Sequence, residues 1–344
     1  RSTASVFDIS PLIKYRIKGK DAENFLNKLT VRNVSLQKIN TVQYTMWCDD
    51  NGSVLDDGTL FKFDVDDFRI CCQERNLPWL IDTSLGFDVK IIEETEDIAG
   101  LSIQGPTSAS VLIKAGYNLI EKLKPFEMIE TQDKLLISRT GFTGDLGYEI
   151  FLPNKLAKIT WDKIWKAGEN LGIKAIGLNA LNIARIETGF IIANSDFITS
   201  EHALRNNRIR NPDEIGMSWM VDMTKPYFNG KNALIKIRDK NESKFVFAAL
   251  EIDGKEPADG AIIYYNKKQE VGIITAATWS PTAKKSIALA SLKLPYGVEI
   301  QSNLWVEIYV LRELEYYKMM KKVFIVKAPF VKLKRRNITP PLSK

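Results

Sequence analysis

The sequence predicts an α+β fold followed by a separate all-β module. Between residues 41 and 104, segments that alternate apolar and polar residues outnumber helical segments, without the regular strand–helix alternation of a doubly wound sheet. From residue 245 onward, short alternating segments dominate, which is typical of a sandwich or barrel. At 344 residues the chain is also longer than one ordinary core, so we expect two or three domains.

The first third opens with a loosely alternating, strand-like segment over 6–17. A helix follows it, because Phe25, Leu26 and Leu29 recur at helical spacing after the acidic start at Asp21. A DDNG turn should join the next two strands into a hairpin. The further elements expected in this third are strands over 41–47, 54–63 and 68–72, a helix over 78–85, strands over 87–94 and 99–104, and a helix over 107–116.

The middle third repeats this mixture and the last third consists of strands. We expect strands over 134–139 and 147–152, and helices over 156–171 and 178–190. Segment 239–244 is the expected linker to the last module. The strands predicted there are 246–252, 261–265, 272–275, 286–292, 304–310 and 322–327.

Composition excludes several classes of function. The net charge of +6 comes from residues 311–344, which carry a surplus of +8 and leave −2 for the rest, so nucleic-acid binding is not favoured. No apolar run is long enough for a membrane span, and the start lacks the regions of a signal peptide. Cys48, Cys71 and Cys72 suit a reduced compartment, the cytoplasm or an organelle matrix, and the single His202 argues against a metal site.

Asp57 is the most informative residue of the first hairpin. Alternation along the strand places Leu55, Asp57, Thr59 and Phe61 on one face, so a carboxylate lies among apolar neighbours. Folds keep such a group where a ligand or a hydrogen-bond network uses it. The alternative is that Asp57 and Gly58 form a turn.

Glu187 is a second acid on an apolar face. In the helix expected over 178–190 it shares a face with Phe190 and so points toward the core. It could form a structural bridge with Arg185 or Arg139. Alternatively, its carboxylate could accept hydrogen bonds from a ligand with adjacent N–H donors, such as an aminopyrimidine ring.

Ten short motifs occur in order along the whole chain. They are VFDIS, IKGKDAENFLNKLT, YTMWCDDNGSVLDD, IQGPTS, SRTGFTGDLGYE, GLNALNIARIETG, NPDEIGMSW, FNGKNAL, SPTAKKSIALA and APF. In this order they resemble the motifs of the aminomethyltransferase family, whose best known member is the T-protein of the glycine cleavage system. The resemblance begins at VFDIS, so we expect further residues to precede Arg1.

The resemblance implies a three-domain cloverleaf around a central hole that holds tetrahydrofolate. Two α+β domains with antiparallel sheets and a C-terminal barrel or jelly-roll-like domain would form it. The implied folate-binding domain is discontinuous, over 1–15 and 118–238. The second domain would span 16–117 and the C-terminal domain 239–344.

The resemblance also implies the site. Asp57 matches the acid near the reacting folate nitrogens, where a carboxylate can stabilise a developing cationic centre and orient an N–H proton. Phe61, Gln73 and Phe142 stand where the family more often has Tyr, Asn and Tyr. The residues implied to bind folate are Leu12, Tyr44, Thr59, Phe61, Gln73, Phe142, Glu187 and Trp219.

The long loop over 194–219 carries Arg205, Arg208 and Arg210. These guanidinium groups could hold the carboxylates of a donor or of the folate tail. A solvated surface loop is the alternative.

Three functions remain open at this point. The first is transfer of a one-carbon unit to tetrahydrofolate from an aminomethyl donor, either a small molecule or a group on a lipoyl carrier protein. The second is folate-dependent demethylation of an N-, S- or O-methyl compound. The third is a non-catalytic folate-binding assembly protein, which the retained Asp57 disfavours.

Overall fold

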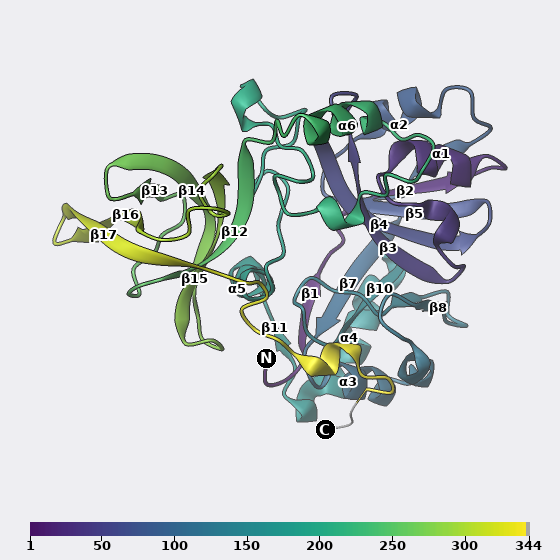
Figure 1. The fold of residues 1–344 in the computed structure, drawn as a ribbon. Helices are drawn as coiled ribbons and strands as arrows, with labels where there is room; N and C mark the ends of the chain where they lie inside the picture. Colours follow the sequence, from purple (N-terminus) through teal and green to yellow (C-terminus); the bar gives the residue numbers. More distant parts are fainter. Residues whose placement is uncertain (342–344) are drawn as a thin grey trace.

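The computed structural model describes residues 1–341, which form two β-sheets covered by helices and one closed barrel (Figure 1). The predicted α+β class with an all-β C-terminal module is therefore confirmed. Short 3-10 helices connect several elements: Val34–Leu36, Asn118–Lys122, Asn154–Leu156, Glu169–Leu171, Asn206–Arg208, Ser218–Met220 and Lys334–Asn337.

The first unit is a six-stranded sheet with two helices on one face. Helices α3 (Ser108–Lys114) and α4 (Ala157–Gly168) pack on it and share one core with its strands. The strands, in order across the sheet, are β11 (Lys174–Ala175), β1 (Ser5–Asp8), β7 (Ile98–Gln104), β10 (Gly147–Pro153), β9 (Leu136–Ser138) and β8 (Met128–Glu130).

The second unit is a five-stranded antiparallel sheet. Helices α1 (Ala22–Leu29) and α2 (Leu77–Ser84) bury their apolar sides on one face of it. The opposite face contacts the first sheet through a shared apolar cluster. The strands, in order, are β3 (Thr41–Cys48), β4 (Val54–Asp64), β5 (Asp67–Cys72), β2 (Ile13–Lys18) and β6 (Lys90–Glu93).

Two expectations about the first third differ from the structure. The single segment expected over 6–17 is split into β1 and β2, which lie in different sheets because the chain crosses between units at residues 9–12. Strand β7 pairs with both β1 and β10, so strand pairing assigns residues 98–114 to the first unit. The boundary that we expected after residue 117 therefore lies before Ile98.

The three cysteines are free and buried. Cys71 and Cys72 lie in different apolar clusters on opposite faces of β5, as the alternation of a strand requires. Burial raises the pKa of all three thiols.

The third unit is a closed six-stranded barrel. Its interior is filled by small and branched apolar side chains, including Ala288, Ala290 and Ile274. The strand expected over 322–327 is much longer, because it begins at Glu315. The strands, in order around the barrel, are β12 (Phe245–Ile252), β15 (Lys285–Lys293), β14 (Gln269–Ser280), β13 (Ile262–Tyr265), β16 (Leu304–Arg312) and β17 (Glu315–Val326).

After the barrel the chain returns to the first unit, where its last segment runs beside α3 and α4 (Figure 1). Val331 N–H donates to the carbonyl oxygen of Glu187 (3.0 Å). Arg335 donates to both carboxylate oxygens of Asp145, at 2.6 and 2.7 Å. The expected domain over 239–344 thus contains a final segment, from residue 327, that does not belong to the barrel.

Helix α5 (Leu178–Thr188) forms the contact between the first unit and the barrel. Ile186 packs on Ala276, Ile287 and Leu289 of the barrel. On the other side of the molecule, α6 (Lys231–Asp239) places Leu234 in a cluster with residues of β3 and β4. In residues 1–341 no helix has the length and apolar character of a membrane span.

A buried ion pair should make a large contribution to stability at this contact. Arg185 Nη1 lies 2.5 Å from Asp196 Oδ2, and the two side chains are 2% and 1% exposed. We expect Arg185→Leu to lower the free energy of unfolding by about 3–5 kcal/mol, since it leaves Asp196 charged and unpaired. Denaturant unfolding measures the change. The exposed pair Lys158–Asp162 is the control, and an equal loss in Lys158→Met would contradict the prediction.

Candidate functional site

The β3–β4 hairpin brings Tyr44 and Asp57 together. Met46 is opposite Asp57 and Tyr44 is opposite Thr59, so the two side chains are diagonal neighbours on one face. The Tyr44 hydroxyl donates to Asp57 Oδ2 over 2.7 Å. Among the described residues, Tyr44 is the one side chain that donates to this carboxylate. Asp57 therefore lies within a strand and not in a turn.

A register shift at the start of β4 corrects one expectation. The pairing changes between Trp47 and Cys48, which leaves Leu55 unpaired between Val54 and Asp56. Leu55 consequently joins the cluster beneath α1 and α2, whereas Phe61 lies in the cluster on the opposite face. Leu55 and Asp57 do not share a face, because the strand alternation is interrupted at this bulge.

The environment of Asp57 raises the pKa of its carboxyl group toward neutral pH. Burial raises the pKa of Asp57 to about 6, although the Tyr44 hydrogen bond opposes this shift. Burial and the neighbouring charge of Asp57 raise the pKa of Tyr44 well above its usual value. Near pH 7, Asp57 is thus mostly a carboxylate while Tyr44 keeps its proton and holds one carboxylate oxygen in place.

Asp56 precedes Asp57 on the opposite face of the strand and supports it through the backbone. Its Oδ1 accepts the Asp57 N–H (2.8 Å), and its Oδ2 accepts Glu74 N–H (3.1 Å) and Asn76 Nδ2 (2.9 Å). The side chain is fully buried. Burial and the adjacent charge of Asp57 raise the pKa of Asp56 to about 8. The sequence signal for this role is the Asp-Asp pair itself.

Trp219 presents an aromatic face beside the same hairpin. It is 63% exposed, and the guanidinium of Arg32 lies 5.7 Å from its ring centre. Arg32 also donates to the Tyr44 carbonyl (3.0 Å). Lys225 stabilises the segment that contains Arg32. Its ammonium group donates to the carbonyls of Thr30 (2.5 Å) and Arg32 (3.0 Å). Arg32 and Lys225 were not among the site residues predicted from the sequence.

Gln73 connects the end of β5 to the segment that follows α5. Its Nε2 donates to the Ala193 carbonyl (3.2 Å), and Asn194 Nδ2 donates to Glu74 Oε1 (3.0 Å). At the start of this segment, Phe190 stacks on Phe142 with ring centres 5.5 Å apart and planes at 29°. Phe142 and Gln73 therefore adjoin the two ends of one short segment, residues 190–194.

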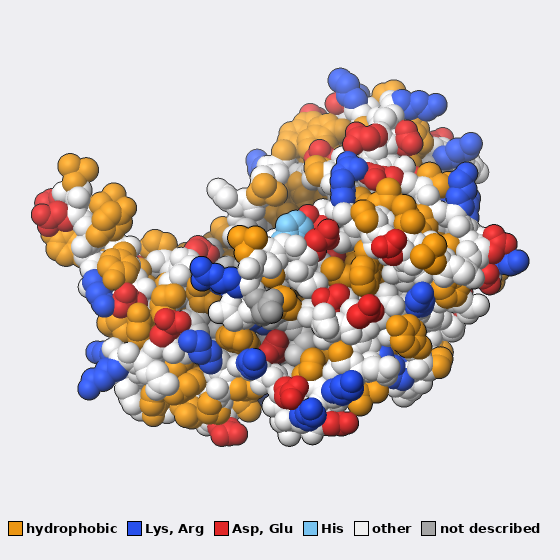
Figure 2. All heavy atoms as spheres, turned by 90° about the horizontal axis from the view of Figure 1, so that it is seen from above, with side chains coloured by type: hydrophobic (Ala, Val, Ile, Leu, Met, Phe, Trp, Pro, Cys, Tyr) orange, Lys and Arg blue, Asp and Glu red, His pale blue; other side chains and the backbone are white. Residues whose placement is uncertain are grey.

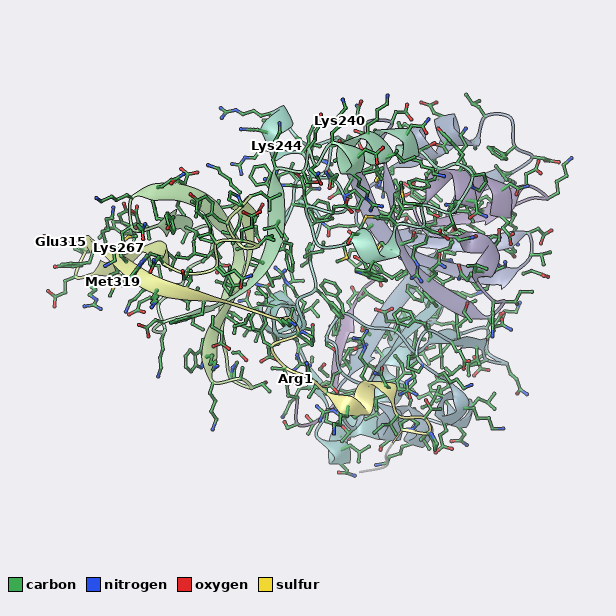
Figure 3. The ribbon with its side chains drawn as sticks, viewed as in Figure 1. Arg1, Lys240, Lys244, Lys267, Glu315 and Met319 are labelled. Atoms are coloured by element: carbon green, nitrogen blue, oxygen red, sulfur yellow. The ribbon has the colours of Figure 1, made fainter. Side chains whose placement is uncertain are left out.

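Glu187 is buried, with 1% of its surface exposed, and both of its oxygens are engaged. Arg1 Nε donates to Oε2 (2.8 Å) and Ser280 Oγ donates to Oε1 (2.7 Å). Figure 3 labels Arg1 at the junction between the barrel and the first unit. The alternative of a bridge from Glu187 to Arg185 or Arg139 is wrong, because Arg185 pairs with Asp196 and Arg139 donates to carbonyls of the C-terminal segment.

Three other predicted folate contacts differ in their surroundings. Phe61 is fully buried between the two sheets, where its ring makes an edge contact with Phe151 at 5.3 Å. Thr59 and Leu12 are half-buried. The Leu12 carbonyl accepts a hydrogen bond from the buried Lys14 Nζ (2.7 Å). Phe61 thus packs inside the protein.

The three arginines of the long loop have different roles. Arg205 and Arg208 are exposed. Arg210 is 9% exposed, stacks on Phe245 at 3.6 Å, and donates to the carbonyls of Asn207 and Ile209. Arg210 therefore supports the fold of the loop. In residues 1–341 no cluster of His, Cys, Asp or Glu could hold a metal ion.

Comparison with known proteins gives the family. The family model described as GCVT N-terminal domain matches residues 1–225, and that of the glycine cleavage T-protein C-terminal barrel domain matches residues 245–332. The chain belongs to the glycine cleavage T-protein family. The predicted membership of this family of transferases is confirmed.

Relatives of this T-protein family member are named aminomethyltransferase. One from Thermoanaerobacter pseudethanolicus is 32% identical over 305 residues, covering 86% of this chain and 80% of the relative. One from Clostridium botulinum is 30% identical over 306 residues, with the same coverage. The structure of glycine cleavage system aminomethyltransferase T from Bartonella henselae is 23% identical with a TM-score of 0.84, covers 96% of this chain and 87% of that chain, and shows the shared fold.

Removing the Tyr44 hydroxyl should move the Asp57 titration. The hydrogen bond lowers the Asp57 pKa, so we expect Tyr44→Phe to raise it above about 6. The chemical shift of 13Cγ-labelled aspartate, followed against pH and assigned with Asp57→Asn, measures this. Tyr227→Phe, at a half-exposed tyrosine elsewhere, is the control. A downward shift in Tyr44→Phe would show that the bond does not stabilise the carboxylate.

Proposed function

We propose that this protein transfers a one-carbon unit from an aminomethyl donor to tetrahydrofolate, with Asp57 as the key acid. The observation that carries the proposal is the Tyr44–Asp57 pair in a chain of the T-protein family. When bound, tetrahydrofolate supplies the nitrogen nucleophiles that accept the one-carbon unit.

Asp57 suits both tasks of such a transfer. With a pKa of about 6 it is mostly ionised at neutral pH, and its carboxylate can stabilise positive charge that develops on the donor. The same value lets it accept or return a proton near neutral pH. Tyr44 fixes Oδ2 and Asp56 fixes the backbone N–H of Asp57, so the carboxylate does not need to reorganise during the reaction.

The surroundings suit a flat heteroaromatic ring with a polar edge. The exposed face of Trp219, which lies beside Arg32 and the Tyr44 strand, can stack on the ring. The Phe142–Phe190 pair offers a second aromatic surface. Glu187 stays a predicted contact to the ring, but Arg1 and Ser280 already use its oxygens, so the proposal rests on Asp57.

Asp57→Asn should separate chemistry from binding. We expect turnover to fall by about 10²–10³-fold while tetrahydrofolate affinity stays near that of the natural chain, since the amide keeps the shape but not the charge. Anaerobic calorimetry measures binding, and formation of the methylene-folate product measures turnover. Asp66→Asn, at an exposed acid after β4, is the control. Unchanged turnover in Asp57→Asn would exclude Asp57 as the acid.

Trp219→Ala should instead weaken binding. Loss of a stacking surface is worth about 0.5–1.5 kcal/mol, which corresponds to a rise of about 2- to 13-fold in the dissociation constant for tetrahydrofolate. Trp305→Ala on the barrel is the matched control, because that ring also lies beside a cation, Lys267 at 3.9 Å. Equal affinities of the two variants would remove Trp219 from the site.

The donor is identified by the same assay. An aminomethyl group on a lipoyl carrier protein should yield methylene-folate, ammonia and the dihydrolipoyl form of the carrier, and this outcome supports the proposed transfer. If small N-, S- or O-methyl compounds are the donors that react, the protein is a folate-dependent demethylase. If no donor reacts although tetrahydrofolate binds, a non-catalytic role remains.

The free thiols of the chain suit a cytoplasmic or matrix location.

A further inference from the structure

A two-stranded arm extends from the barrel beyond its closed wall. Strand β13 pairs with β16 only as far as Glu307, and β12 pairs with β17 only from Val323 onward. Residues 308–322, which we call the arm, continue as a hairpin outside these contacts. The arm projects from the rest of the molecule in both orientations (Figures 1 and 2).

The arm is a regular hairpin with a tight turn. Glu313 and Leu314 both have positive φ, 47° and 70°, as a two-residue turn that matches strand twist requires. Pairing of β16 with β17 is continuous to Arg312 and Glu315 at the tip. Figure 3 labels Glu315 near the tip and Met319 farther along β17. The arm is therefore an ordered two-stranded ribbon.

One edge of the arm carries backbone groups that no strand pairs with in residues 1–341. Asp253 N–H donates to the Lys322 carbonyl (3.0 Å), so Lys322 directs its backbone groups away from β16. Strand alternation directs the N–H and C=O of Tyr316, Lys318 and Met320 to the same side. Such an edge is a template for another strand.

The face of the arm that turns away from the barrel interior combines exposed apolar side chains with the Lys318–Glu307 ion pair. Tyr309, Leu311 and Tyr316 lie on it with 55%, 54% and 72% of their surface exposed. Leu314 at the tip is 93% exposed. Figure 2 shows hydrophobic side chains at the protruding end beside acidic ones. Contiguous apolar exposure of this kind marks an interaction surface.

We propose that two copies of this chain associate by antiparallel pairing of their β17 edges over residues 315–321, about a two-fold axis at Lys318. A two-fold axis perpendicular to the sheet places each residue opposite one on the same face. Lys318 then faces Lys318 of the second copy as a hydrogen-bonded pair. Tyr316 and Met320 form the two flanking hydrogen-bonded pairs, so all six free N–H groups of the two edges find acceptors.

In that register, the side chains along the β17 edge of one copy are complementary to those along the β17 edge of the second copy. Glu315 lies opposite Lys321 of the second copy, which makes one ion pair at each end of the interface, next to the pair that Lys321 forms with Glu256 of its own chain (3.3 Å). Tyr316 lies opposite Met320, and Tyr317 opposite Met319, contacts that favour a thioether against a ring.

Two further points support the axis at Lys318: the environment of the two central lysines, and a comparison with the neighbouring registers. Each Lys318 is held by Glu307 of its own chain, at 2.5 Å, which offsets the like charges at the axis. Moving the axis by one residue, to Tyr317 or Met319, also pairs the outward groups, but it sets Glu315 opposite Met319 or Val323 and loses the ion pairs. The charges therefore select the axis at Lys318.

The interface is small, so the association should be reversible. Stable complexes bury roughly 1,200–2,000 Å². A strand pair of seven residues lies toward or below that range, so we expect a dimer whose population rises with protein concentration.

Two proline variants test which edge is used. Lys318→Pro removes an outward N–H from the β17 edge without removing a bond to β16. Leu311→Pro does the same on the opposite, β16 edge and serves as the matched control. By sedimentation velocity over rising concentration, the natural chain and Leu311→Pro should approach twice 39.0 kDa, while Lys318→Pro stays monomeric.

A charge exchange tests the register. Glu315→Lys and Lys321→Glu should each weaken self-association, and an equimolar mixture of the two should restore it, because every ion pair is re-formed in the mixed dimer. Circular dichroism confirms that the variants are folded. A natural chain that stays monomeric, a Lys318→Pro dimer, or a mixture no tighter than its components would overturn the proposal.

Discussion

The buried ion pair between Arg185 and Asp196 is the constraint that fixes the barrel against α5 and the segment that follows it. Asp196 accepts from Arg185, from Ile192 N–H and from Thr275 of the barrel, so one carboxylate joins α5, the segment after it and β14. Two charges with almost no exposure persist only where geometry and further hydrogen bonds compensate their desolvation. The segment that separates Phe190 from Gln73 is thereby held to the barrel.

Burial and hydrogen bonding also determine the roles of the two acids at the candidate site, Asp56 and Asp57. Asp56 is completely buried and accepts three N–H donors, so it acts as a fixed support. Asp57, one residue along, keeps partial exposure and one phenolic donor, which leaves it available to a ligand. The two adjacent carboxylates on opposite faces of one strand thus have different roles, one structural and one chemical, and burial together with the charge of Asp57 raises the pKa of Asp56.

Sequence patterns predicted most elements because apolar periodicity reports burial directly. The strands around Asp57 and all six barrel strands were found in this way, and ten motifs in order predicted the family. Long-range partners could not be predicted. Nothing local indicates that Arg1 would meet Glu187, that Arg210 would stack on Phe245, or that a bulge would turn Leu55 to the other face. These depend on which surfaces meet after folding.

The path of the chain around the barrel has a mechanical consequence. The barrel is entered after α6 and left at residue 327, and the departing segment is fastened to α5 and Asp145. A module with one connection can swing about any axis, whereas one with two anchored connections can rotate chiefly about the line that joins them. Movement of the barrel relative to the two sheets is thereby restricted at both of its connections.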